Sequence, residues 1–515
     1  MNILNRKEIF AILLCLVIGF ALRFYTFDRK SLWEDEIYTF NDSRYGLKDQ
    51  IKFYRGNSSY LHPPGFFLLT HLLYPFTKPE RDLRIFPLIF GILSIPQFYF
   101  LARRFSPTIA FPSTLSLAFM TYHISLSQEG RFYSLLMFLG TAGLCFFVKH
   151  LKTNQKRYLV LVALLFAALL HASYSSIPFI ILSQILWFYE PRNASSKGRF
   201  SSFLILNGLL LLFCIPWLSF IASNYEGQPL MDPFQARVPI SFWDTLYGVF
   251  NDWVPHSPLT IVAVILLILF PILSRFRKNA IVLLLVFVVP IIGLNLYCKL
   301  FKVGHFITSR YFVSFMPLFL ITMYLCLDEI ESKFSGLKRF VRLRLLFTFL
   351  FIASNLLILP PYYRSEKEDF RGLANYLKDQ LRPGDKLLDL EVEYVPGILH
   401  YFGVYPEGRQ YTATFRKFSD DDFELRTSFV YRNNEYMIYS SKNCSGRYIA
   451  DGNRLWIVAG IATAKKIKEN PGYVLKGYFD GSFLNLNRFP TDASMYLFLL
   501  DPQSPGEKGI DLPIE

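Results

Sequence analysis

The sequence predicts an α-helical polytopic membrane protein with a C-terminal soluble α/β domain. Hydrophobic residues make up 52% of the 515 residues and charged residues only 18%, whereas a soluble globular protein has about 25% charged residues. The hydrophobic excess lies before residue 361, in runs of about 20 residues, the length that crosses a bilayer. We therefore expect a transmembrane domain over residues 1–360 and an extracytoplasmic α/β domain over residues 361–515.

About eleven transmembrane helices are expected in the first domain. Nine of them are single apolar runs, at about 8–26, 83–101, 107–125, 132–148, 203–221, 257–274, 280–297, 311–327 and 345–360. The segment 158–189 is too long for one span and short for two, and basic residues flank it on both sides. We expect it to cross and return as two short helices, joined by a turn over residues 171–176.

The basic residues follow the pattern of a membrane protein. The formal net charge is +14, but most lysines and arginines lie in short blocks between apolar runs, which argues against a nucleic-acid partner. Basic loops remain on the cytoplasmic side. This rule predicts a multi-pass protein of the cell inner (plasma) membrane, with a cytoplasmic N-terminus and residues 361–515 outside. The six cysteines show neither a paired framework nor metal-ligand spacing.

The tail after residue 360 alternates between helix and strand patterns. Helices are expected near 366–381 and 394–402, and strands near 386–390, 455–458, 473–475 and 496–499. The first helix meets a clear stop at Pro383-Gly384. Alternating elements of this kind are typical of a mixed or parallel sheet.

Two adjacent acids follow the first span. Asp35 and Glu36 lie in the first long outer loop, residues 27–82. An adjacent acidic pair can act as a general base with its orienting partner, or as a metal ligand. The pair is equally typical of a solvated acidic turn at the start of a surface helix. The residues alone leave both interpretations open.

Further polar side chains lie where the predicted spans meet the outer face. They are His62, Glu129, Arg131, His256, His305, Arg310 and Tyr311. Each type has an ordinary explanation: a histidine beside helix-starting prolines, an acid and a base that pair weakly, or an arginine that reaches up to lipid head groups. The spans follow from apolar runs and charge bias alone, yet they bring these residues and the Asp35–Glu36 pair to one membrane face.

Four motifs in this order resemble a known family. They are Trp-Glu-Asp-Glu-Ile-Tyr-Thr at 33–39, His-Pro-Pro-Gly-Phe-Phe at 62–67, Ser-Gln-Glu-Gly-Arg-Phe-Tyr-Ser at 127–134 and Ser-Arg-Tyr at 309–311. The family is the bacterial dolichyl-phosphate-mannose-protein mannosyltransferase-like group, which includes the lipid A aminoarabinose transferases and belongs to the C-type (GT-C) membrane glycosyltransferases. Glu-Asp-Phe-Arg-Gly at 368–372 also resembles the start of that family's outer domain.

The resemblance implies a transferase that works on the outer face. Its donor would be a polyprenyl-phosphate-linked sugar, and its acceptor a lipid, glycan or protein. The family's acidic residue carries over to Asp35, with Glu36 beside it, and Arg310, His62 and Tyr311 are the candidates for binding the donor phosphate. Some relatives have a Glu-Lys pair where this chain has Leu61-His62. This departure leaves the cofactor unknown and a divalent metal open.

The turn at 171–176 is a candidate wall of a cavity. Thirteen helical residues from Tyr158 rise only about 20 Å, short of the roughly 30 Å hydrocarbon core, so the turn should stop below the outer surface. We expect His171 and Tyr174 to face a water-filled cavity, with hydrogen bonds between helices as the alternative. Glu129, Arg131, His256 and His305 are further candidates for the cavity or acceptor site.

Two other classes of protein compete with the enzyme. A lipid or solute transporter places ionisable residues near the bilayer midplane, on broken helices, whereas the acids here lie at one boundary. A structural assembly protein would tolerate replacement of Asp35. The motifs favour the transferase.

Overall fold

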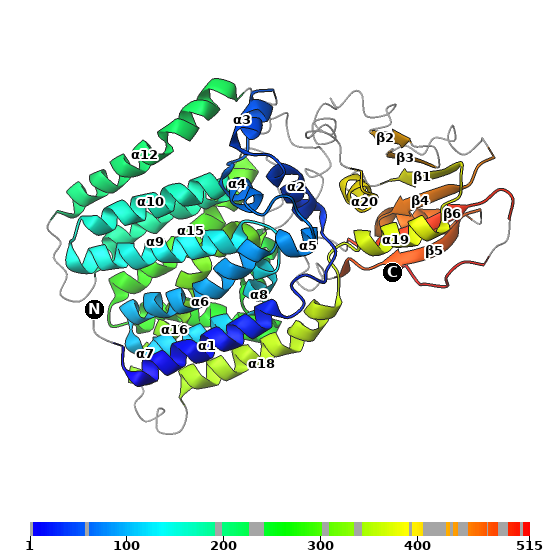
Figure 1. Ribbon diagram of the computed structural model, residues 1–515. Coiled ribbons are helices and arrows are strands. Elements are labelled where there is room, and N and C mark those ends of the chain that lie inside the picture. Colours follow the sequence, from blue (N-terminus) through cyan, green and yellow to red (C-terminus); the bar gives the residue numbers. More distant parts are fainter. Residues whose placement is uncertain are drawn as a thin grey trace. The chain divides into compact units, whose positions relative to one another are not determined.

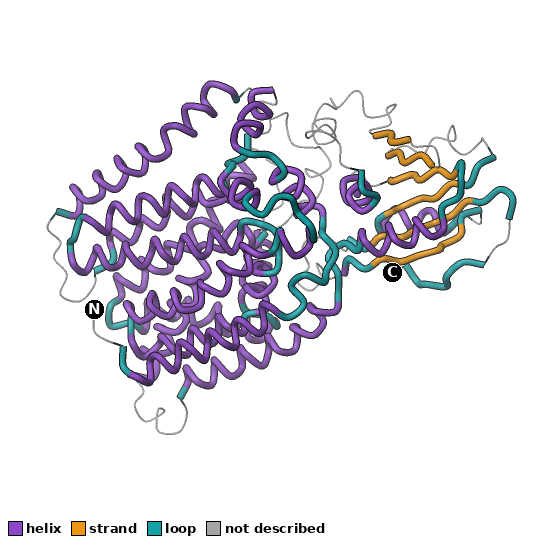
Figure 2. The backbone as a smooth tube through the Cα atoms, viewed as in Figure 1, coloured by secondary structure: helices purple, strands orange, loops and turns teal. Residues whose placement is uncertain are grey.

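The computed structural model describes residues 4–56, 61–190, 198–225, 242–300, 308–333, 342–390, 394–404, 429–432, 436–440, 452–470, 472–482, 493–504 and 508–514 (Figures 1 and 2). The chain forms two compact units. Unit 1 contains Met1–Phe27, Gly46–Leu73 and Arg81–Pro360, and unit 2 contains Asp28–Tyr45, Tyr74–Glu80 and Pro361–Glu515. The division into 1–360 and 361–515 stays a prediction. What the structure shows is that two pieces of the first long loop group with the C-terminal residues.

Unit 1 is helical (Figure 2). Its elements are α1 (Arg6–Phe24), α3 (Leu47–Gly56), α4 (Gly65–His71), α6 (Ile85–Phe105), α7 (Pro107–Phe119), α8 (Thr121–Ser127), α9 (Tyr133–Thr153), α10 (Arg157–Ala172), η1 (Tyr174–Ser176), α11 (Ile177–Leu182), η2 (Ser183–Phe188), α12 (Arg199–Asn224), α13 (Phe242–Trp253), α14 (Ser257–Leu273), α15 (Arg277–Leu300), η4 (Ser309–Phe315), α16 (Met316–Lys333) and α18 (Leu343–Arg364). A short α5 (Pro79–Asp82) precedes α6. Helix α9 packs against both α6 and α10, as Figure 1 shows.

Among the described residues, six helices are long and apolar enough to cross a membrane, or up to eight if each of two bent pairs counts as one span. The expected number of about eleven is therefore not confirmed. Two physical features account for part of the difference. The 19 residues of α1 include four charged side chains, Arg6, Lys7, Glu8 and Arg23, and α10 with the following Tyr174–Phe188 helix are shorter than a full span.

The chain breaks where the 158–189 segment predicts a turn. Helix α10 ends at Ala172, and Ser173 adopts an extended conformation with φ −166° and ψ 140°. The Ser173 side chain then accepts a hydrogen bond from the backbone amide of Ser175 and starts η1. The expected pair of short apolar helices is thus present.

A second break, between α7 and α8, falls inside the expected single span 107–125. The two helices meet at 60°, and Met120 between them is extended. Arg23 of α1 compensates for the interrupted helix, because its guanidinium donates to the carbonyls of Leu117 and Ala118 at 3.1 and 2.9 Å. The same group lies 2.6 Å from Nδ1 of His123. Buried carbonyls that a bent helix leaves open need such donors.

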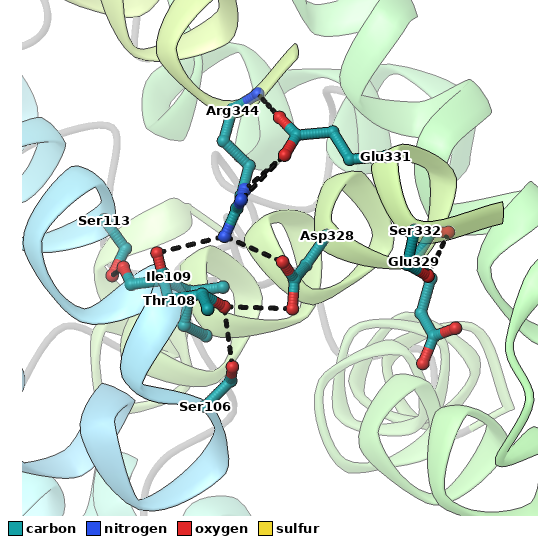
Figure 3. Close-up of polar contacts among 9 residues, drawn as sticks. All are labelled: Ser106, Thr108, Ile109, Ser113, Asp328, Glu329, Glu331, Ser332 and Arg344. Carbon is teal, nitrogen blue, oxygen red and sulfur yellow. Dashed lines mark hydrogen bonds and ion pairs between the residues drawn. The ribbon is translucent and has the colours of Figure 1, made fainter. Parts of the chain in front are cut away.

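A group of polar side chains, the Arg344 cluster, joins the ends of three helices (Figure 3). The guanidinium of Arg344, at the start of α18, contacts Glu331 Oε2 through Nη2 at 2.7 Å and Asp328 Oδ1 through Nη1 at 2.7 Å. It also donates to the carbonyl of Thr108 on α7 at 3.1 Å. The Thr108 hydroxyl donates to Asp328 at 3.0 Å. The cluster therefore fixes α7, α16 and α18 together.

Unit 2 is built on a mixed sheet of six strands in the order β2-β3-β1-β4-β6-β5. Its strands are β1 (Asp385–Asp389), β2 (Phe429–Arg432), β3 (Tyr436–Ser440), β4 (Leu455–Ala459), β5 (Val474–Phe479) and β6 (Met495–Leu500). Strand β1 pairs in parallel with β3 and β4, and the other three pairings are antiparallel. The expected mixed α/β sheet is confirmed, although β2 and β3 were not among the expected strands.

In the described part of the chain, the helices that lie wholly in unit 2 are α2 (Glu34–Ser43), α19 (Phe370–Gln380), α20 (Val395–Tyr401) and α22 (Ile461–Lys468). Helix α19 starts later than the expected residue 366 because Asp369 caps it: its carboxylate accepts the Gly372 amide at 2.8 Å. Helix α19 packs against β5, and α20 packs against both α19 and α2. The helix that bears Asp35 is thus part of the fold of unit 2.

Candidate functional site

Asp35 and Glu36 occupy the first turn of α2 in different environments. Glu36 is fully buried and its carboxylate accepts the amide of Trp33 at 3.4 Å, as an acid in the third helical position often does. Asp35 is only half-buried. Ile37 and Phe40 supply the apolar face of the helix and are buried. The pair therefore divides into a buried acid that helps to start the helix and a more accessible one that suits proton transfer.

Arg310 lies in η4 of unit 1, beside an acid from another element. The Ser309 hydroxyl donates a hydrogen bond to Asp252 of α13, and the Asp252 carboxylate interacts electrostatically with Arg310. The Arg310 guanidinium lies 5.8 Å from the centre of the Tyr133 ring, and its Nε donates to the Thr308 hydroxyl at 3.4 Å. Arginine, acid and hydroxyl thus form one polar cluster at the start of the η4–α16 span.

The predicted residue Glu129 belongs to the same neighbourhood. It is buried, and together with Asp252 and Arg310 it acts electrostatically on the half-buried side chain of Tyr122. Arg131 lies nearby in sequence with its guanidinium 4.9 Å from the Phe132 ring. Tyr311 is half-buried and packs against the core of unit 1. Glu129 and Arg310 therefore both lie within electrostatic range of Tyr122, and a shared role in the site stays a prediction.

Asp252 and Tyr122 are the members of this cluster that the sequence motifs do not identify. One signal for Asp252 exists: with Asn251 it interrupts an apolar run whose members Val249, Phe250 and Trp253 are buried. A carboxylate in such a run needs a partner. Nothing comparable marks Tyr122 in the sequence.

The His62 motif meets the 171–176 turn through a glycine. A Cβ on Gly65 would lie 2.5 Å from the carbonyl oxygen of His171, so only glycine allows the start of α4 to approach α10 this closely. His62 itself, three residues earlier, is half-buried. Two expected site segments are therefore adjacent within unit 1.

His171 and Tyr174 make hydrogen bonds to α12. His171 Nε2 lies 3.4 Å from the carbonyl oxygen of Phe213, and the Trp217 indole donates to the Tyr174 hydroxyl at 3.0 Å. Trp217, which the motifs do not identify, also packs against Tyr54. These are the hydrogen bonds between helices that the alternative interpretation expects. A cavity lined by His171 and Tyr174 stays a prediction.

The remaining candidates lie apart from these contacts. His256 is exposed and precedes α14 with φ 73°, in the left-handed region. His305 falls outside the described residues. Within the described part of the chain, no group of three or more His, Cys, Asp or Glu side chains is placed to hold a metal ion.

Comparisons with known proteins bear on the fold as a whole. Residues 61–220 match the family model of dolichyl-phosphate-mannose-protein mannosyltransferases. No curated protein matches the sequence significantly. Crystal structures of ArnT from Cupriavidus metallidurans, in the apo state and bound to undecaprenyl phosphate, each align with 96% of this chain and 99% of their own, with a TM-score of 0.54 and 10% sequence identity.

A further match is weaker. The archaeal oligosaccharyltransferase AglB from Archaeoglobus fulgidus, in complex with an inhibitory peptide and a dolichol-phosphate, aligns with 78% of this chain and 64% of its own, with a TM-score of 0.46 and 12% identity. The resemblance predicted from the motifs is confirmed by the family model over 61–220 and by the ArnT fold over nearly the whole chain. The chain is a multi-pass membrane protein with this fold.

Proposed function

We propose that this chain is a membrane glycosyltransferase that moves a sugar from a polyprenyl-phosphate-linked donor to a lipid, glycan or protein acceptor. The observation that carries the proposal is the alignment of 96% of the chain with ArnT, one of whose structures holds undecaprenyl phosphate. The mannosyltransferase family model over 61–220 supports it independently. Both matches are to transferases, and neither favours the alternative of a lipid or solute transporter.

Asp35 would serve as the general base. In the proposed reaction an acceptor hydroxyl or amine attacks the anomeric carbon of the donor sugar. Its proton passes to the Asp35 carboxylate, and the bond from the anomeric carbon to the phosphate oxygen breaks. The half-buried position of Asp35, beside a fully buried Glu36, supports this assignment.

Arg310 would bind the donor phosphate. The leaving polyprenyl phosphate gains negative charge as the bond breaks, and a guanidinium can stabilise two of its oxygens at once. The position of Arg310 at the start of an apolar span, with a hydroxyl and an aromatic ring beside it, supports this role. His62 and Tyr311 remain secondary candidates for the same phosphate.

The orientation of the chain in the membrane is part of the proposal. Basic loops predict a cytoplasmic N-terminus in the inner membrane and an extracytoplasmic position for residues 361–515. Two exposed positions test it, Asn154 and Lys466. A cysteine at 154 should react with an impermeant thiol reagent only after permeabilisation, and one at 466 should react in intact cells. The reverse pattern would contradict an outer-face reaction.

The test of the activity uses purified full-length protein with defined polyprenyl-phosphate sugars and mass spectrometry of the products. Asp35→Asn keeps the size of the side chain but removes the proton acceptor, so transfer should fall by about 10²-fold or more. The exposed Asp49 provides a matched control, because Asp49→Asn makes the same chemical change elsewhere. Near-normal turnover of Asp35→Asn would assign the pair to helix capping alone.

A further inference from the structure

The segment that leads into α2 is held by side chains from much later in the chain. We infer that residues 366–371 together with Tyr401, here called the anchor, position Asp35, and that Glu368 is a positioning residue for it. The inference rests on the proposed role of Asp35 as the base. All the residues involved belong to unit 2.

Three backbone amides within four consecutive residues donate to anchor side chains. The Ser31 amide donates to Glu366 Oε2 at 3.0 Å, and the Leu32 amide donates to the Tyr401 hydroxyl at 2.7 Å. The Glu34 amide donates to Glu368 Oε2 at 2.7 Å. Each of these amides has its own side-chain acceptor, so the course of the backbone immediately before Asp35 is closely defined.

Side chains of the anchor and of the segment before α2 also contact each other around this backbone. The Lys367 ammonium lies 3.9 Å from the centre of the Trp33 ring. The Arg371 amide donates to the Ser31 hydroxyl at 3.2 Å, and the Arg371 guanidinium donates to the carbonyl of Arg29. Lys30 reaches in the opposite direction and donates to the carbonyl of Ser365 at 2.7 Å. The two segments therefore hold each other from both sides.

A second layer supports the anchor. The Tyr401 hydroxyl, which accepts the Leu32 amide, donates in turn to Glu80 at 3.0 Å. Glu80 lies 3.5 Å from the Arg371 guanidinium. Glu80, in the 74–80 piece of unit 2, thus joins both ends of the anchor.

The anchor matters because α2 is only ten residues long. Isolated helices shorter than about 12 residues are marginal in water, so tertiary contacts must fix where α2 starts and how it is oriented. The Glu368 carboxylate binds the first amide of the helix, where a negative charge is favourable. Since a general base must lie within hydrogen-bond reach of the proton it takes, a small displacement of α2 would cost turnover.

The experiment compares Glu368→Gln and Glu368→Ala with the wild-type full-length protein. Glutamine can still accept the Glu34 amide, so it should retain most of the turnover, whereas alanine cannot. For Glu368→Ala we expect kcat to fall about 10- to 100-fold while the donor KM changes by less than about twofold. Amide hydrogen exchange over residues 31–36 should accelerate in the same variant. Glu469→Gln and Glu469→Ala, at an exposed position of unit 2, are the matched controls.

The two readouts separate the possible failures. Unchanged exchange over 31–36 in Glu368→Ala would overturn the anchor, whatever the activity shows. Accelerated exchange with unchanged kcat would overturn the positioning role. Normal transfer by Asp35→Asn would instead overturn the proposed function, while the exchange data would still decide whether Glu368 holds this segment.

Discussion

The two ends of the Ser309–Lys333 span both combine an arginine with acidic side chains, but the acids are used differently. At the Lys333 end, two carboxylates bind Arg344 directly, each at 2.7 Å. At the Ser309 end, the Asp252 carboxylate accepts its hydrogen bond from Ser309, while Arg310 lies over the Tyr133 ring.

The difference indicates what each arginine can do. Arg344 has a side-chain exposure of 15%, its partner Glu331 of 2%, and the cluster holds two negative charges against one positive. Removing one partner from such a buried group is costly, and its excess negative charge repels a further anion. At the Ser309 end the Asp252 carboxylate accepts its hydrogen bond from a hydroxyl, and the Arg310 guanidinium lies beside an aromatic ring. A phosphate is therefore expected to bind at the Ser309 end and not at the Arg344 cluster.

The largest effect should come from Arg310→Ala. If Arg310 stabilises the leaving phosphate, its removal should lower transfer by about 10²–10³-fold, with little change in thermal stability. Turnover with a defined polyprenyl-phosphate sugar measures the first quantity and a thermal unfolding scan the second. Arg342→Ala, at an exposed position, is the control. If Arg310→Ala unfolds the protein and does not selectively lower turnover, then Arg310 has a structural role like that of Arg344, and the proposed difference between the two ends is wrong.

Arg344→Ala should show the opposite behaviour. It leaves the buried Glu331 without its cation, which costs about 3 kcal/mol of unfolding free energy. Denaturant unfolding of the purified protein measures this cost, and the turnover of the fraction that stays folded should match wild type. A specific loss of donor binding in this variant would show that both ends serve the substrate.

Lysine in place of each arginine sharpens the comparison further. Arg310→Lys keeps the charge and loses the two-pronged geometry, so donor affinity should fall about tenfold in a binding titration. Arg344→Lys should cost about 1 kcal/mol of stability and leave donor affinity unchanged. Equal donor affinities in wild type and Arg310→Lys would assign Arg310 to an interaction with lipid head groups.

The smallest effect concerns an acid outside this span, Glu366 of the anchor. Burial raises the pKa of its carboxyl to about 7, and the negative charge of Asp369 also raises it. The folded chain therefore holds this proton between about pH 4.5 and 7, where the unfolded chain has released it. The resulting stabilisation is complete below about pH 4.5 and is lost as the pH rises through 7.

Glu366→Gln mimics the protonated carboxyl at every pH. Its melting temperature relative to wild type should therefore rise by about 2–4 °C between pH 5 and pH 8. Burial lowers the pKa of His400 to about 4, which destabilises both proteins equally at acidic pH and cancels in the difference. A constant difference across this pH range would show that Glu366 is ionised throughout.

Local patterns predicted the local features of the structure. The turn at Ser173 follows from the length of the 158–189 segment and its basic flanks, and the end of α19 follows from Pro383 and Gly384. The break at Met120 has no such signal: no glycine or proline lies between α7 and α8, and Arg23, which supports the break, is almost a hundred positions earlier in the chain.

In the candidate site, too, the sequence predicts the residues that lie in local motifs and misses those that distant contacts position. Asp35, Glu129 and Arg310 lie in motifs, so their types and boundaries identify them. The place of Asp252 in the site is shown by a hydrogen bond from Ser309, 57 positions later. The role of Glu368 is shown by a hydrogen bond from an amide 334 positions earlier. Contacts between such distant positions arise from tertiary structure, and no periodicity or propensity within either segment encodes them.

The distance along the chain between α2 and its anchor has a consequence for biosynthesis. Ser31 leaves the ribosome 335 residues before Glu366, the side chain that binds its amide. At about 5–20 residues per second, α2 waits on the order of half a minute for its partners. Until then the proposed base belongs to a short helix without support. Chains that end before residue 366 would contain Asp35 without its anchor and be inactive, so activity would begin only after residues 366–371 and Tyr401 have been made.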